Sequence, residues 1–186
     1  MANTCSTYYK CVGDPSELKQ LLAILESTSK PFLCTILEKM GVNLKDLSEQ
    51  GLGCRGSIIW YEYDGDRILS IDQETAWCEQ EGFRRSIEKV FPSVKVYYLE
   101  EEPGCDVFYT NDPNGEFFPQ RFLLDSPDVY EYFENIEDVI DYLQEKFHIS
   151  VEEQTESGIQ SAIDRYAEER DDDFWMYIHE FKYSEN

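Results

Sequence analysis

The stretch QETAWCEQEGFRRSIEKVFPSVKVYYLEEEPG, residues 73–104, decides the fold class. Apolar side chains recur at helical spacing between residues 83 and 91, and Pro92 then ends the helix because proline cannot continue it. Apolar residues alternate between residues 94 and 98, which is typical of a half-buried strand. The stretch therefore predicts a helix followed by a strand, and an apolar strand leads into it.

The region upstream predicts the other half of the same arrangement. A first strand is expected over residues 5–12, where aromatic and β-branched side chains are frequent. A helix then begins at Asp14, which can accept a hydrogen bond from the first turn, with Pro15 at the first helical position and Glu17 completing a capping box.

A hairpin is expected between these two halves. Residues 57–63 and 67–73 predict two strands that are joined by Asp64-Gly65-Asp66, a typical tight-turn sequence. We interpret the two aspartates as turn residues and not as metal ligands. The resulting order (strand, helix, strand, strand, helix, strand) predicts an α+β, ferredoxin-like fold, βαββαβ, with an antiparallel sheet and its helices on one face.

Two further regions surround this core. Residues 30–55 are expected to form a helical insertion with Gly41 closing one helix, and residues 1–125 are expected to form the ferredoxin-like domain. Extra strands are predicted over residues 105–110, 121–124 and 130–133. Residues 126–186 predict an acidic C-terminal extension with two helices, the first capped by Asn135, and a last strand near residues 175–181.

The composition limits the classes of partner. Among 186 residues, 39 are acidic and 16 are basic, which gives a formal net charge of −23. Such a chain repels nucleic-acid backbones and anionic membranes, so we expect neither direct nucleic-acid binding nor membrane binding. It can attract a basic protein partner. The start of the chain has no signal-peptide pattern, and the six cysteines form no Cys-x-x-Cys pair, so we expect reduced thiols and a cytoplasmic location.

No pattern typical of a catalytic or cofactor site is present in the sequence. Phosphate-binding glycine motifs are missing, and two histidines without paired cysteines make a structural zinc improbable. Cys78 lies near a predicted helix N-terminus, but no base is identified beside it. We therefore expect no catalytic residues, no cofactor, no metal and no enzymatic activity, with an unrecognised enzyme site as one alternative.

Trp77 is interpreted as a packing residue that covers the helix end and fills the sheet edge. It belongs to a set of short motifs made up of Asn3, Cys5, Thr75, Ala76, Trp77, Phe91, Pro92 and Gly104. In these motifs the chain resembles the YubB-like family of ferredoxin-like domain proteins from plasmids, phages and other mobile elements. The resemblance covers roughly residues 1–125 and implies a fold, a cytoplasmic location and an accessory role on a mobile element, with no active-site residues to transfer.

The acidic residues of the C-terminal extension are the remaining candidates for a site. We expect the protein to act by binding a protein partner, with these acids as possible contacts. An alternative is that rows of carboxylates imitate DNA and inhibit a restriction enzyme or another nucleic-acid enzyme, but we interpret these acids first as the solvated faces of amphipathic helices. The residues concerned are Glu131, Glu134, Glu137, Asp138 and Asp141.

Overall fold

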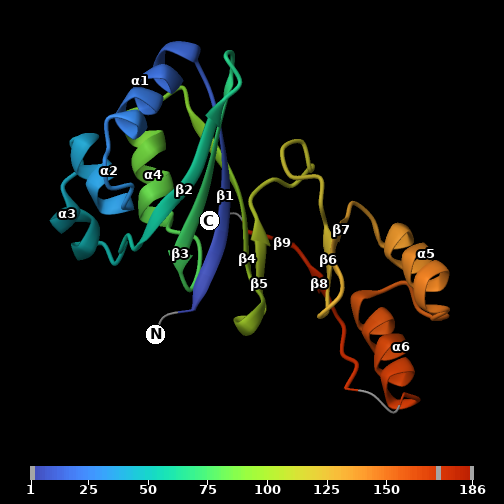
Figure 1. Ribbon diagram of the computed structural model, residues 1–186. Coiled ribbons are helices and arrows are strands. Elements are labelled where there is room, and N and C mark those ends of the chain that lie inside the picture. Colours follow the sequence, from blue (N-terminus) through green and yellow to red (C-terminus); the bar gives the residue numbers. More distant parts are fainter. Residues whose placement is uncertain (1–2, 171–172, 185–186) are drawn as a thin grey trace. The chain divides into compact units, whose positions relative to one another are not determined.

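The computed structural model describes residues 3–170 and 173–184 and divides the chain into two compact units (Figure 1). The first unit comprises Met1–Asp112 with Ser184–Asn186, and the second comprises Pro113–Tyr183. The expected boundary at residue 125 is therefore wrong. Strand β6 (Phe122–Asp125) belongs to the second unit because both of its hydrogen-bonded neighbours, β7 and β8, lie there.

In the first unit the strands are neighbours in the order β2-β3-β1-β4-β5, and each pair among them is antiparallel. This confirms a mixed α+β architecture. Its elements are β1 (Thr4–Val12), α1 (Pro15–Glu26), α2 (Leu33–Lys39), α3 (Leu44–Glu49), β2 (Gly56–Tyr63), β3 (Ile68–Ala76), α4 (Glu81–Val90), β4 (Lys95–Glu102), the 3-10 turn Pro103–Cys105, and β5 (Val107–Thr110).

The start of α1 follows the expected capping chemistry with one correction. The carboxylate of Asp14 accepts the N–H of Ser16 at 2.8 Å, and Pro15 occupies the first turn. Glu17 does not return to the backbone of Asp14. Instead, its carboxylate accepts the N–H and hydroxyl of Ser93 at 2.9 and 2.7 Å, while that hydroxyl accepts the Asp14 N–H at 3.0 Å. Glu17 and Asp14 are therefore linked through Ser93, a residue that follows α4. These hydrogen bonds hold the start of α1 close to the end of α4.

The hairpin turn is confirmed, since the Asp64 carboxylate accepts the N–H groups of Asp66 and Ile68 at 2.8 and 3.0 Å. Strand β3 is longer than expected and continues to Ala76, because β1 pairs with it over its whole length. The insertion contains a second helix, α3, that its short and weakly periodic sequence did not predict. Gly41 ends α2 in a left-handed conformation, as expected.

One continuous apolar core holds the first unit together. Helices α1, α2 and α4 lie on the same side of the sheet (Figure 1) and place leucine, isoleucine and phenylalanine side chains against Tyr9, Ile71 and Val96 of the central strands. This face of β1 carries the odd-numbered residues, since successive strand residues alternate between the two faces. The apolar layer gives way to polar residues towards the end of the sheet where α4 begins.

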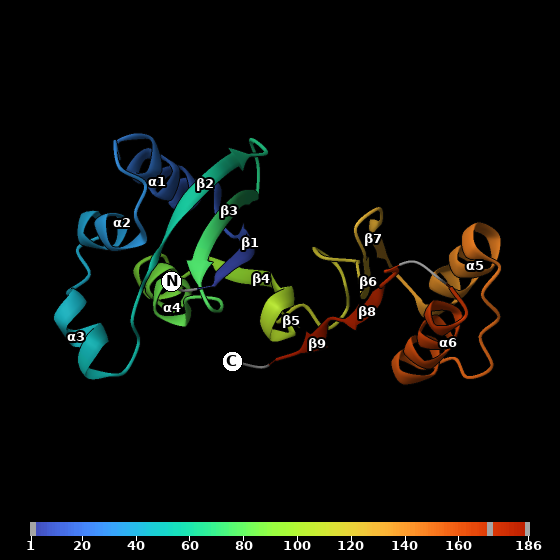
Figure 2. The same cartoon turned by 60° about the horizontal axis from the view of Figure 1, so that its bottom comes forward.

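The second unit is a smaller α+β layer with its own core. Strands β7 (Tyr130–Phe133), β6 and β8 (Tyr177–Glu180) pair antiparallel in that order, and α5 (Ile136–Phe147) and α6 (Glu156–Glu168) cover one face (Figure 2). Asn135 caps α5 by accepting the N–H of Asp138 at 2.9 Å. A two-residue strand, β9 (Lys182–Tyr183), follows. None of the helices within the described residues has the length and apolar character needed to cross a bilayer.

Candidate functional site

Six of the eight residues that resemble the family signature meet at one end of the first unit's sheet. Cys5 pairs with Thr75 in the β1–β3 register, and the carbonyl of Asn3 accepts the N–H of Trp77 at 3.0 Å. The Asn3 side chain donates to Glu102 at 3.2 Å, and a Cβ on Gly104 would lie 2.9 Å from the same carboxylate. We call this region the Trp77 corner; it comprises Asn3, Cys5, Thr75, the loop 77–80, and residues 100–104.

Trp77 is not the largely buried packing residue that we expected. Its side chain is 43% exposed, and its φ of 74° is unfavourable for a bulky residue. The cause is the sharp turn from β3 into α4, which the chain completes within four residues. Trp77 lines a cavity of about 330 Å³ together with Arg55, Glu79, Glu81 and the glycines of the preceding loop. The other two signature residues lie elsewhere, since Phe91 and Pro92 follow the far end of α4.

Two buried carboxylates converge beneath the loop of the Trp77 corner. Glu79 accepts hydrogen bonds from the Tyr9 hydroxyl and, at 3.1 Å, from the Arg84 guanidinium. Glu100, on β4, accepts the backbone N–H of Glu79. The Arg84 guanidinium also lies 5.2 Å from the centre of the Tyr98 ring. One arginine thus faces two acids in a site that water hardly reaches, since the Glu100 residue is only 6% exposed.

The environment of these acids favours their protonated forms. Burial raises the pKa of Glu100 to about 7, and the nearby Glu79 carboxylate adds to the effect. Burial also raises the pKa of Glu79, although the positive charge of Arg84 opposes the shift. Partial desolvation and the nearby Glu100 and Glu79 carboxylates raise the pKa of the Cys78 thiol, so this cysteine is not the activated thiolate that a helix N-terminus favours. The pair Glu79–Glu100 can therefore hold and release a proton near neutral pH.

Several polar atoms at this end of the sheet lack a hydrogen-bond partner among the described residues. Both polar atoms of the Gln73 side-chain amide and Nη2 of Arg84 are buried and have no such partner. Gln73 and Glu100 both pair with Thr7, so the three residues form a polar row across the helix-facing side of the sheet. Buried unpaired donors and acceptors are costly and are commonly found where a ligand or water completes the bonding.

A second candidate lies on the face of the three-stranded sheet opposite α5 and α6. Residues 122 and 124 of β6 and 176 and 178 around the start of β8 enter the core of the second unit, so the residues alternating with them face the other way. That opposite face bears four aromatic side chains with exposed fractions between 38% and 51%. We call it the aromatic face, and its exposed rings are Tyr130, Tyr132, Trp175 and Tyr177.

The rings of the aromatic face form two contacting pairs. Tyr130 and Tyr132 meet edge to face with centres 5.7 Å apart, and Trp175 and Tyr177 are also 5.7 Å apart. Asp125, on the central strand, pairs directly with Tyr130 on one side and Tyr177 on the other. A carboxylate therefore stands between two tyrosines in one row across the sheet. Sequence reasoning found the strands but did not identify this row, because it depends on the register of three separated segments.

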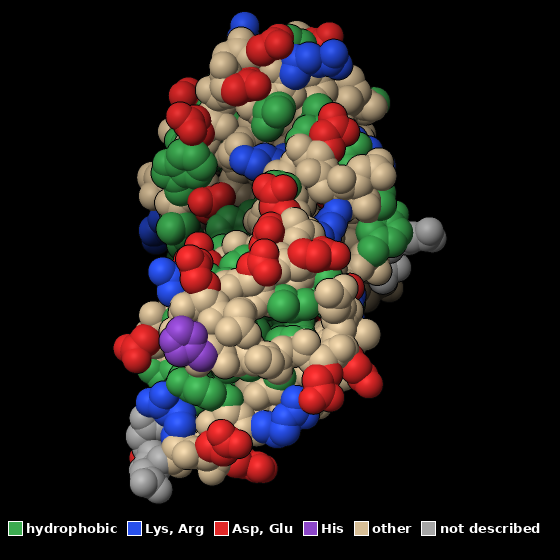
Figure 3. Space-filling model, turned by 90° about the vertical axis from the view of Figure 1, so that its right-hand side faces the viewer, with side chains coloured by type: hydrophobic (Ala, Val, Ile, Leu, Met, Phe, Trp, Pro, Cys, Tyr) green, Lys and Arg blue, Asp and Glu red, His purple; other side chains and the backbone are tan. Residues whose placement is uncertain are grey.

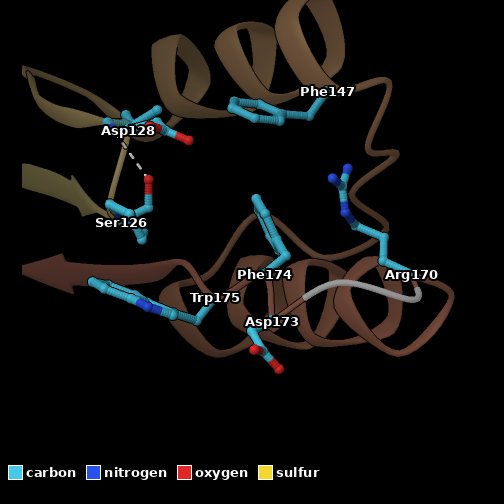
Figure 4. A pocket seen from close by; sticks show the side chains of 9 residues that line it. Ser126, Asp128, Phe147, Arg170, Asp173, Phe174 and Trp175 are labelled. Atoms are coloured by element: carbon cyan, nitrogen blue, oxygen red, sulfur yellow. Dashed lines mark hydrogen bonds between the residues drawn. The ribbon is translucent and has the colours of Figure 1, made fainter.

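A cavity of about 280 Å³ lies in the second unit near Trp175 (Figure 4). Phe147, Phe174 and Arg170 surround the space, and Trp175 lies on the side of Ser126 (Figure 4). The Arg170 guanidinium is 5.0 Å from the centre of the Phe174 ring and 5.3 Å from that of Tyr166. The unit thus already contains one arginine stacked on aromatic rings.

The five acids predicted as partner contacts are all exposed, but they lie on β7, on the turn after it and on the first turns of α5. Asp138 has a structural task there, because its carboxylate accepts a hydrogen bond from the Asn135 side chain at 2.7 Å. In the face drawn in Figure 3, acidic side chains stand beside hydrophobic and basic ones. Imitation of DNA by these acids stays a prediction.

Within the described parts of the chain, no group of three or more histidine, cysteine or acidic residues is arranged to hold a metal ion. Comparison of the chain with family models, with curated proteins and with solved structures found no match.

Proposed function

We propose that the protein is a binding module that engages a basic protein partner through the aromatic face of its second unit. The observation that carries this proposal is the set of four exposed aromatic rings on one side of a small sheet. Exposed aromatic patches are typical of interaction sites, because tyrosine and tryptophan bury much surface at a small entropic cost. A single exposed ring would not indicate an interaction site, but these four rings form two contacting pairs.

The charge of the second unit supports a basic partner. Between Pro113 and Tyr183 the sequence has 19 acidic and 5 basic residues. Acids also flank the aromatic face, with Asp125 inside it and Asp128 and Glu180 near its borders. Complementary charge raises association rates and rejects acidic partners, and it disfavours nucleic acid as the direct ligand.

Affinity capture with single-residue variants tests the proposal. Wild-type protein, Tyr177→Ala and Trp60→Ala are used as baits at low and at high salt, and the captured proteins are compared. Trp60 is a matched control because it is 47% exposed and lies on β2 in the first unit. We expect a basic protein to be captured by wild type and by Trp60→Ala but not by Tyr177→Ala. Equal capture by all three baits would contradict the proposal.

We propose further that the first unit has a ferredoxin-like arrangement and belongs with the YubB-like proteins. The strand order β2-β3-β1-β4 with α1 and α4 as the connecting helices supports the first statement. The meeting of six signature residues at the Trp77 corner supports the second, since these positions are far apart in the sequence. The accessory role on a mobile element that this family implies is part of the same proposal.

A second candidate function is favoured by the Trp77 corner, where an exposed strained tryptophan borders a cavity beside buried, proton-binding carboxylates. Such a combination is typical of small-molecule sites and of enzymes that transfer protons. Ligand-observed NMR with a mixture of polar metabolites tests it, with Glu100→Gln as the comparison. Binding that is seen with wild type and lost in the variant supports a ligand site. If no compound binds either protein, the corner has a structural role.

A further inference from the structure

We propose that Asp125, Tyr130 and Tyr177 form a receptor for one arginine side chain of the partner. This inference rests on the proposed function and adds the chemistry that the aromatic face recognises. The three residues are directly paired across β7, β6 and β8, so their side chains emerge in one row on the same face. The arginine guanidinium would lie above Asp125 with a tyrosine ring on either side.

The spacing between the strands allows one planar guanidinium to fit between the two tyrosine rings. Neighbouring strands lie about 4.8 Å apart, so the backbones that carry the two tyrosines are separated by about 10 Å. A planar guanidinium placed over the central strand can contact both rings at ordinary van der Waals distance. The row lies at the end of the sheet, where β6 stops and β7 and β8 begin.

The protein already contains the same three-part arrangement, occupied by its own arginine. In the first unit, the Arg84 guanidinium binds the Glu79 carboxylate at 3.1 Å and lies 5.2 Å from the centre of the Tyr98 ring. On the aromatic face, the acid and the rings are present, whereas no described residue forms an ion pair with Asp125. A basic partner would supply the guanidinium.

Arginine fits this row better than lysine does. Its planar, weakly hydrated guanidinium stacks on aromatic rings and binds carboxylates through two parallel hydrogen bonds, whereas an ammonium is a compact and strongly hydrated charge. Arg170, stacked 5.0 Å from Phe174 in the same unit, shows that guanidinium stacking is used in this region. We therefore expect discrimination between arginine and an uncharged analogue of the same shape.

The experiment uses the full chain and two short peptides, Gly-Ser-Arg-Ser-Gly and its citrulline counterpart, in which an uncharged urea group replaces the guanidinium. Binding is followed by NMR titration of isotopically labelled protein. We expect the arginine peptide to bind about tenfold more tightly than the citrulline peptide, with shifts centred on residues 123–131 and 175–179. Equal affinity of the two peptides overturns the proposal.

Variants separate the receptor from general charge attraction and from misfolding. Asp125→Asn is expected to remove most of the tenfold preference, while Asp141→Asn, an exposed acid on α5, leaves it unchanged. Replacing both Tyr130 and Tyr177 by phenylalanine keeps the rings and retains the preference, whereas leucine at both positions removes it. If Asp141→Asn reduces the preference as much as Asp125→Asn does, attraction is unspecific and the receptor is refuted.

The outcome is distinguishable from a failure of the proposed function. If Tyr177→Ala abolishes capture of a protein partner while Asp125→Asn leaves capture unchanged, the aromatic face binds its partner without the arginine receptor. In that case the function stands and this inference fails. If the arginine peptide binds as expected but neither variant alters partner capture, the receptor exists and the partner binds elsewhere.

Discussion

Replacing Glu100 by glutamine should stabilise the first unit at alkaline pH. The carboxyl has a pKa of about 7 in the folded protein and an ordinary value of 4.5 when exposed, because burial disfavours its charged form. The folded state therefore binds the proton more tightly than the unfolded state. The stability that comes from the protonated form is fully present below pH 4.5 and is lost as the pH rises through 7.

The size of this loss follows from the two pKa values. Each pKa unit corresponds to about 1.4 kcal/mol, so ionised Glu100 lowers the free energy of unfolding by about 3 kcal/mol at pH 8. Glutamine has nearly the same shape as the protonated acid and can still accept the N–H of Glu79. We expect Glu100→Gln to exceed wild type by about 3 kcal/mol at pH 8 and by roughly 1 kcal/mol at pH 5.5.

Urea unfolding at several pH values measures this difference. Trp175→Phe is introduced into both proteins, so that fluorescence comes from Trp60 and Trp77 of the first unit alone. The exposed Glu74, on β3 at the same end of the sheet, provides the control Glu74→Gln, which should show no comparable dependence on pH. A stability difference between Glu100→Gln and wild type that stays constant from pH 5.5 to 8 would refute the argument.

Three further predictions concern other parts of the chain. Brief alkylation at pH 8 should modify the exposed Cys78 and Cys105 but not the fully buried Cys5 and Cys11, as read by mass spectrometry; modification of all four would contradict the burial. Gly56→Ala should cost about 2–3 kcal/mol in urea unfolding, since φ is 150° and a Cβ would lie 2.4 Å from the Glu74 carbonyl oxygen. Gly53→Ala, whose Cβ meets nothing within 4 Å, is its control, and an equal cost would contradict the steric reason. Neutralising all five predicted contact acids should reduce partner capture by less than about threefold, because they lie mainly outside the aromatic face; complete loss would favour imitation of DNA instead. The acids are Glu131, Glu134, Glu137, Asp138 and Asp141.

Most of the elements could be predicted because their signals are local. The cap at Asp14, the turn at Asp64 and the apolar spacing in α4 and α5 each involve residues within a few positions of one another. The unit boundary could not be predicted in this way. It depends on whether β6 pairs with strands before it or after it, and the sequence of β6 itself does not contain that information.

The residues of the candidate sites were even harder to predict from local sequence. Glu100, Glu101 and Glu102 carry no sequence signal of burial, since carboxylates are rarely buried, yet each is at most 6% exposed. The signal that could have revealed Glu100 was the alternation of β4, which continues from Val96 through Tyr98 onto the helix-facing side. Asp125 between two tyrosines had no local signal, because the row is assembled from three strands.

The chain leaves the first unit after Asp112 and returns to it at Ser184, whose N–H donates to the carbonyl of Thr110 at 2.9 Å. The exit and the re-entry are therefore adjacent on the same strand edge. This geometry makes residues 113–183 a removable cassette. A short linker from Asp112 to Ser184 would close the gap and keep the hydrogen bond between Ser184 and Thr110.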